Sequence, residues 1–111
     1  MTLSEFIENY NIDISMYEFF TLDKLINMSA TNSKIALEVS AYMLARAKNQ
    51  IATHARLSPV ECIKWAGAAM TISDVLYKKY QKGESTIKPL SLILNEEELK
   101  EVEKLINQIK K

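Results

Sequence analysis

The sequence predicts an all-α fold, a bundle of four to five helices, and three observations support this. The 111 residues include only two Gly and two Pro, against about eight and about five to six at average usage. Hairpins and tight turns need those residues, so a β-rich fold is not expected. Apolar residues also recur at helical spacing along most of the chain. Finally, several segments open with residues that cap helices.

The N-terminal part of the chain predicts short helices. Residues 3–9 form the first, because their apolar side chains are spaced over two helical turns. Residues 15–20 are rich in aromatic side chains and fit either a short helix or an extended apolar plug. Thr21 fits the N-cap of a further helix that covers about residues 22–28.

A long helix is expected over residues 33–55, with Asn32 or Ser33 as its N-cap. Its apolar residues cover a stripe wider than the usual amphipathic face. Small side chains, chiefly Ala, are frequent in it. Because small side chains let another helix approach closely, this helix should pack against a neighbour.

A second long helix, over residues 59–82, has the clearest local signal in the chain. Ser58 fits the N-cap, Pro59 the first helical position, and Glu61 the third position of a capping box. Gly83 fits the residue just past the end. The two long helices are joined by a short connection, so we expect an antiparallel hairpin.

The C-terminal part predicts one amphipathic helix. Pro89 excludes a helix through residues 84–94, of which 91–94 could be extended. Asn95 fits the N-cap of a helix over about residues 96–109, which has acidic residues in its first turn and a single apolar stripe. This helix should lie on the core formed by the hairpin.

The length predicts a single domain over residues 1–111 that is large enough to bury one core. The chain has one cysteine, Cys62, so neither an internal disulfide nor a Cys-based zinc site is expected. No basic stretch followed by an apolar run opens the sequence, and no segment approaches the roughly 18 apolar residues of a membrane span. We therefore expect a cytoplasmic protein without a membrane association.

The sequence carries no pattern typical of catalysis, a metal or a cofactor. His54, the only histidine, could act as a base for Cys62. Cys62, however, lies on an apolar helical face, and His54 suits the end of a helix. The gap between Arg46 and His54 is too long for the pairs of some helical ribonucleases. With two glycines there is no phosphate-binding loop. We expect no enzyme, no metal and no cofactor.

Charge is unevenly distributed although the net charge is zero. Residues 1–30 hold five acids and one Lys, residues 31–89 nine bases and four acids, and residues 90–111 five acids and four Lys. The basic middle could contact phosphates, or its side chains could be solvated helix faces. The candidate nucleic-acid-binding residues are Arg46, Lys48, Arg56, Lys64, Lys78, Lys79 and Lys82.

Aromatic residues and Met gather near the N-terminus. They have the composition of a protein interface, although a place in the core is the favoured interpretation. The candidate interface residues are Tyr10, Met16, Tyr17, Phe19 and Phe20.

Gly67 offers two interpretations of the second long helix. A turn there would make residues 59–82 a helix-turn-helix-like DNA-binding segment, with residues 71–82 as the recognition helix. An unbroken helix would instead use Gly67 for close packing. The DNA-binding motif needs an apolar residue about six positions after the Gly, where this chain has Ser73. The unbroken helix is therefore favoured.

The function expected from these observations is that of a non-catalytic accessory or adaptor subunit that binds a protein partner. By analogy with other small helical subunits, we place it within a nucleic-acid-handling assembly. The alternative is a small DNA-binding regulator that uses residues 59–82. A homodimer through an exposed hairpin face is a further expectation, because the long helices carry ample apolar surface.

Overall fold

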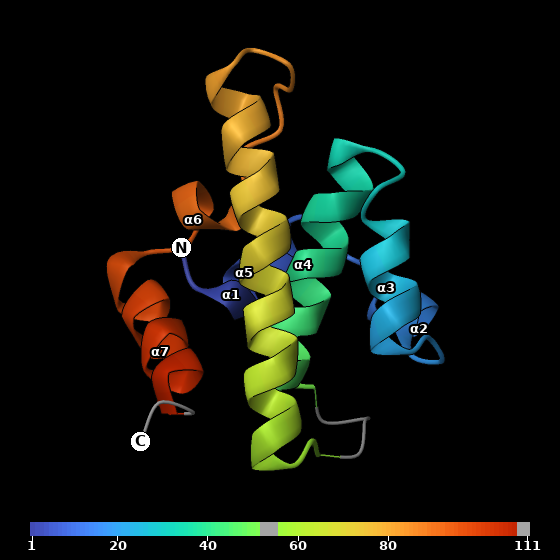
Figure 1. Cartoon of the computed structure of the whole chain (residues 1–111), viewed down its shortest axis with the longest axis vertical. Helices are drawn as coiled ribbons and strands as arrows, with labels where there is room; N and C mark the ends of the chain where they lie inside the picture. Colours follow the sequence, from blue (N-terminus) through green and yellow to red (C-terminus); the bar gives the residue numbers. More distant parts are fainter. Residues whose placement is uncertain (52–55, 109–111) are drawn as a thin grey trace.

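The computed structural model describes residues 1–51 and 56–108 (Figure 1). This part of the chain contains seven helices and no strand, which confirms the all-α fold. The helices are α1 (Leu3–Asn9), α2 (Ile14–Tyr17), α3 (Leu22–Met28), α4 (Ser33–Ala47), α5 (Pro59–Gln81), α6 (Leu90–Ile93) and α7 (Glu96–Asn107).

The antiparallel pair of α4 and α5 forms the centre of the fold and makes its largest helix–helix contact. In Figure 1, α3 and α2 lie to one side of this pair and α7 to the other. Ten of the fifteen residues of α4 are buried, against seven of the twenty-three in α5. The core is therefore organised around α4, and the short helices cover it.

The first long helix is shorter than the sequence predicted, and its expected end at residue 55 is wrong. It ends at Ala47, and Asn49 adopts a left-handed conformation with φ of 53°. The N–H groups of Asn49 and Gln50 donate to the carbonyls of Arg46 and Ala45, both at 3.0 Å. This is the Schellman arrangement, with Asn in the position usually held by Gly. Residues 52–55 lie outside the described part of the chain.

The second long helix is unbroken, as the favoured interpretation predicted. The close packing that this interpretation assigned to Gly67 is wrong, because a Cβ added there would meet no atom within 4 Å. The side chain of Ser58 accepts the N–H of Glu61, and the Glu61 carboxylate accepts the N–H of Ser58, so the capping box is complete. At the other end Gly83 has φ of 75°. The helix continues through Gly67, and the side chain of Thr71 donates to the Gly67 carbonyl at 3.0 Å. The turn that a helix-turn-helix would need is therefore absent, and the interpretation that required it is wrong.

The remaining elements follow the predicted caps. Thr21, Asn32 and Asn95 each accept the backbone N–H three residues on. An extended conformation was one possibility for residues 91–94, but Leu90–Ile93 form one helical turn directly after Pro89. The end predicted for the last helix, residue 109, lies outside the described residues. No helix in the described part is both long and apolar enough to cross a membrane.

Candidate protein-binding surface

The predicted aromatic interface divides into a buried and an exposed part. Tyr17 is 1% exposed and belongs to the core, and Phe20 is partly buried against that core. Phe19, which lies between them, is 88% exposed. Met16 and Tyr10 are each about half exposed. Only the exposed members can form a surface for a partner.

Tyr17 fixes α2 against α4. Its ring lies 5.5 Å from that of Tyr42 and 6.5 Å from that of Phe20, and its hydroxyl donates to Glu38 at 3.4 Å. Burial, together with the negative charge of Glu38, raises the pKa of Tyr17 to about 12. The tyrosine is thus a neutral core anchor.

Phe19 projects from the turn between α2 and α3. The backbone N–H of Phe20 donates to the Tyr17 carbonyl at 3.1 Å. This hydrogen bond closes the turn that contains Phe19. An aromatic side chain that stays exposed forgoes about 1.5–3 kcal/mol of burial free energy.

We call Phe19 and Met16 together the Phe19 knob. Residues 1–23 hold five acids and no Lys or Arg, so the knob stands on an acidic segment.

A groove lies at the opposite end of α3, and sequence reasoning missed it. It is bounded by Ile26 and the end of α3, by the first turn of α4, and by α5 between Thr71 and Lys79. Its volume is about 350 Å³. Ile26 is 39% exposed and Val75 is 51% exposed. We call this the α3–α5 groove. Because its walls come from three helices, no local sequence pattern could have predicted it.

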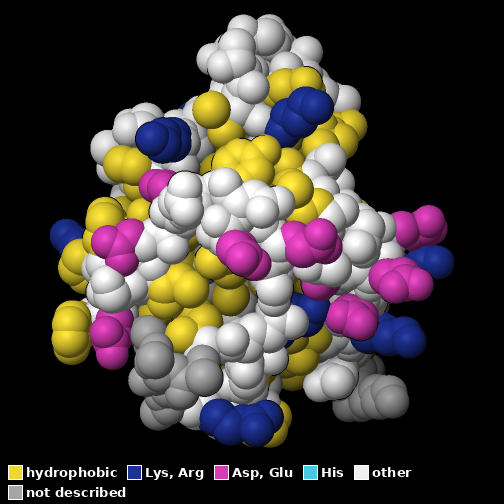
Figure 2. All heavy atoms as spheres, turned by 180° about the vertical axis from the view of Figure 1, so that it is seen from behind, with side chains coloured by type: hydrophobic (Ala, Val, Ile, Leu, Met, Phe, Trp, Pro, Cys, Tyr) yellow, Lys and Arg dark blue, Asp and Glu magenta, His cyan; other side chains and the backbone are white. Residues whose placement is uncertain are grey.

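The basic residues do not form one patch. Arg56 precedes α5 and Lys64 lies near its start, whereas Lys78, Lys79 and Lys82 lie at its end. A separation of 14 residues along a helix corresponds to about 21 Å. On the face shown in Figure 2, Lys and Arg side chains stand in separate places, with acidic side chains across the middle.

Arg46, in the last turn of α4, and Lys48, the C-cap of that helix, make contacts that stabilise the fold. The guanidinium of Arg46 lies 5.0 Å from the centroid of the Trp65 ring and donates to the Tyr42 hydroxyl at 3.3 Å. Lys48 forms an ion pair with Glu98 and another, at 2.9 Å, with Glu101. Neither Arg46 nor Lys48 therefore belongs with the exposed lysines of α5.

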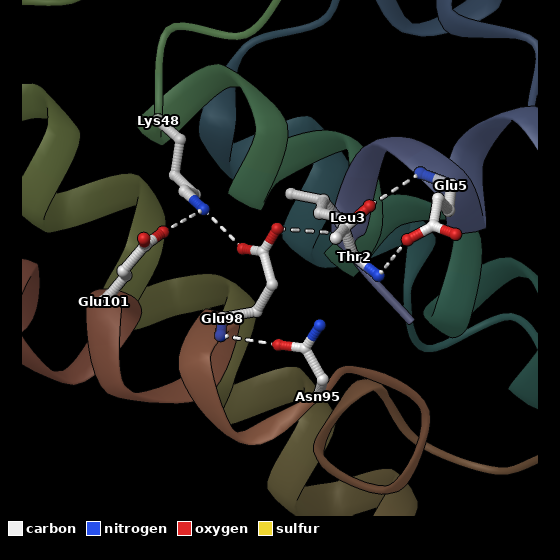
Figure 3. A network of polar contacts seen from close by, with 7 residues as sticks. All are labelled: Thr2, Leu3, Glu5, Lys48, Asn95, Glu98 and Glu101. Carbon is white, nitrogen blue, oxygen red and sulfur yellow. Dashed lines mark hydrogen bonds and ion pairs between the residues drawn. The ribbon is translucent and has the colours of Figure 1, made fainter.

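Lys48 is part of a polar network that joins α1, near the N-terminus, to α7 (Figure 3). The Glu98 carboxylate accepts the N–H of Leu3 at 3.1 Å as well as the Lys48 ammonium. The N–H of Asn95 donates to the carbonyl of Met1 at 2.8 Å. Burial opposes both charges, but the hydrogen bonds outweigh it and hold the pKa of Glu98 below, and that of Lys48 above, the ordinary value. The network holds α1, α4 and α7 together.

Cys62 is packed inside the fold and is buried from solvent. Its thiol is buried, receives the Asn49 amide at 3.5 Å and lies 3.6 Å from the Leu57 carbonyl. His54, the base considered for it, lies outside the described residues. Within residues 1–51 and 56–108, no three His, Cys, Asp or Glu side chains form a group that could hold a metal ion.

Comparison of the chain with protein-family models, curated proteins and solved structures gave no significant match. We therefore base the function on the two apolar surfaces, the Phe19 knob and the α3–α5 groove.

Proposed function

We propose that this protein is a non-catalytic accessory or adaptor subunit that binds a protein partner through the Phe19 knob. One observation supports the proposal above all others: a phenylalanine that is 88% exposed stands between two aromatic residues that are packed on the core. Aromatic residues and Met are enriched in protein interfaces, and a few such residues carry most of the binding free energy.

The local structure favours this role because the knob is already ordered. Tyr17 and Phe20 hold the residues on either side of Phe19, and Thr21 begins α3 immediately afterwards. Little backbone freedom would be lost on binding, so more of the burial free energy would appear as affinity.

A nucleic-acid-handling assembly is the finer part of the proposal. Its support is limited to the exposed lysines at the end of α5, Lys78, Lys79 and Lys82, which could contact phosphate backbones. A DNA-binding regulator built on residues 59–82 is not favoured, because α5 is unbroken.

The test is capture of partners from a lysate of the source organism on immobilised wild-type protein, on Phe19→Ser and on a control, Leu92→Ser. Leu92 is an exposed apolar residue on α6, away from α2. We expect wild type and Leu92→Ser to retain the same protein, identified by mass spectrometry, and Phe19→Ser to lose it. Nuclease treatment should leave this capture unchanged. Equal capture by Phe19→Ser, or loss after nuclease, would contradict the proposal.

A further inference from the structure

The α3–α5 groove is shaped to take an apolar side chain. Ile26 and Val75 form its exposed rims, and Ile72 and Leu76 from α5 also line it. Its volume of about 350 Å³ is in the range of pockets that hold a small molecule, so an aromatic side chain fits with room for a neighbour. Small residues from the α3–α4 connection, such as Ala30, leave space for a second backbone to approach.

The surroundings of the groove are positive. Lys79 is the one charged residue among those that line it. From Val75 to Gly83, α5 and its cap carry three lysines and no acid. The nearest acid on α5, Asp74, is exposed but does not line the groove. The groove also contains the first turn of α4, the positive end of that helix dipole.

The Phe19 knob has the opposite charge. Glu18 adjoins Phe19, and Asp13 and Asp23 lie at the starts of α2 and α3. Residues 1–23 contain no base, and the first base of the chain, Lys24, directly follows Asp23, so the acids around the knob outnumber it. An apolar knob in an acidic setting therefore matches an apolar groove in a basic setting, and both are present on this chain.

One molecule cannot bring its own knob and groove together. Phe19 precedes α3, whereas the groove begins at the far end of that helix. Seven helical residues span about 10 Å. In Figure 1, α2 lies near one end of α3 and the turn into α4 at the other. A contact between copies through these two surfaces is consequently head to tail, and each bound copy presents a further knob or groove.

We infer that the α3–α5 groove receives the Phe19 knob of a second copy of this chain, so that copies associate head to tail. The inference rests on the proposed function in one respect: it takes the knob to be a protein-binding surface, and names another copy as what the knob binds.

The experiment is sedimentation-velocity ultracentrifugation of the full chain over a concentration series. Wild type is compared with the knob variant Phe19→Ser and with two groove variants, Val75→Glu and Lys79→Glu. Val60→Glu and Leu92→Ser are matched controls, because each changes an exposed apolar residue outside both surfaces. Circular dichroism and thermal unfolding establish that every variant is folded.

We expect wild type and both controls to form species larger than a monomer as concentration rises, and less so in high salt, because exposed charges are then screened. When each is measured by itself, the knob variant and both groove variants should remain monomeric. A mixture of Phe19→Ser with Val75→Glu should give a 1:1 dimer and nothing larger, because one intact groove then meets one intact knob.

If wild type stays monomeric up to about 1 mM, the dissociation constant for self-association lies above about 1 mM. That result would overturn the inference. So would a mixture that stays monomeric, or association that survives in Phe19→Ser. Failure here is distinct from failure of the proposed function. A monomeric wild type whose capture of another protein depends on Phe19 supports the function and refutes self-association. If that capture also fails in Val75→Glu, the groove binds the other protein rather than a second copy.

Discussion

The ammonium of Lys48 pairs with the carboxylate of Glu98, 50 residues away in the sequence. The two side chains are only 12% and 11% exposed. Their environments nevertheless differ: Lys48 has a second partner in the exposed Glu101, whereas Glu98 has a second partner in the backbone N–H of Leu3. Because of this difference, removing the charge of Lys48 and removing the charge of Glu98 should change the free energy of unfolding by different amounts.

Loss of Lys48 should cost more than neutralisation of Glu98. Lys48→Met would leave a largely buried carboxylate with only one donor, and we expect a loss of about 3 kcal/mol in the free energy of unfolding. Glu98→Gln keeps an acceptor for Leu3 and leaves Lys48 paired with Glu101, so we expect about 1 kcal/mol. Urea unfolding of both variants measures the difference. Equal losses would mean that Glu101 contributes nothing to holding Lys48.

Acid should weaken the fold partly through Glu98. Because the pKa of Glu98 is lowered in the folded state from its ordinary 4.5, its contribution is full above that value and is lost as pH falls through the lower, folded-state pKa. Urea midpoints of wild type and Glu98→Gln, measured from about pH 6 down to about pH 3, should therefore converge as pH falls. Profiles that stay parallel would show that the Glu98 carboxylate is not stabilised by folding.

The two glycines should respond oppositely to the same substitution. Gly67 lies inside α5, and a Cβ there would have no atom within 4 Å, so Gly67→Ala should stabilise the protein by about 0.8–1 kcal/mol. Gly83 has φ of +75°, so Gly83→Ala should destabilise it by about 1 kcal/mol. Thermal unfolding of both variants measures these shifts. A destabilised Gly67→Ala would indicate a turn rather than a continuous helix.

Tyr17 and Phe19, two residues apart, should differ sharply when truncated. Tyr17→Ala removes a core ring packed on Tyr42 and should cost about 3–5 kcal/mol. Phe19→Ala removes an exposed ring and should change stability by no more than about 0.5 kcal/mol. Chemical unfolding compares the two. A large loss for Phe19→Ala would place that ring in the core and remove the basis of the knob.

Helix starts could be predicted because their signals are local. The caps Thr21, Ser58 and Asn95 bond to N–H groups three residues on, so a short stretch of sequence contains the whole interaction. The end of α4 was missed because Asn49 takes a left-handed conformation that glycine usually marks. Asn gives a weaker sequence signal for such an end than Gly does.

The surfaces could not be predicted because they depend on contacts between distant segments. Nothing in the run of aromatic residues distinguishes Tyr17 from Phe19; the position of α4, with Tyr42 and Glu38, decides which ring is buried. Lys48 was grouped with the other basic residues because its partners lie about 50 positions away. The composition of this segment fitted either a core or an interface, and only the packing of α2 on α4 shows which side chain is exposed.

The bond between the Leu3 N–H and the Glu98 carboxylate also sets an order of events during synthesis. Its two partners are 95 residues apart, so at about 5–20 residues per second the second is made roughly 5–20 s after the first. Until Glu98 has been made, α1 lacks this hydrogen bond. Helix α1 is thus fastened by a residue of α7 that is translated well after α1 itself.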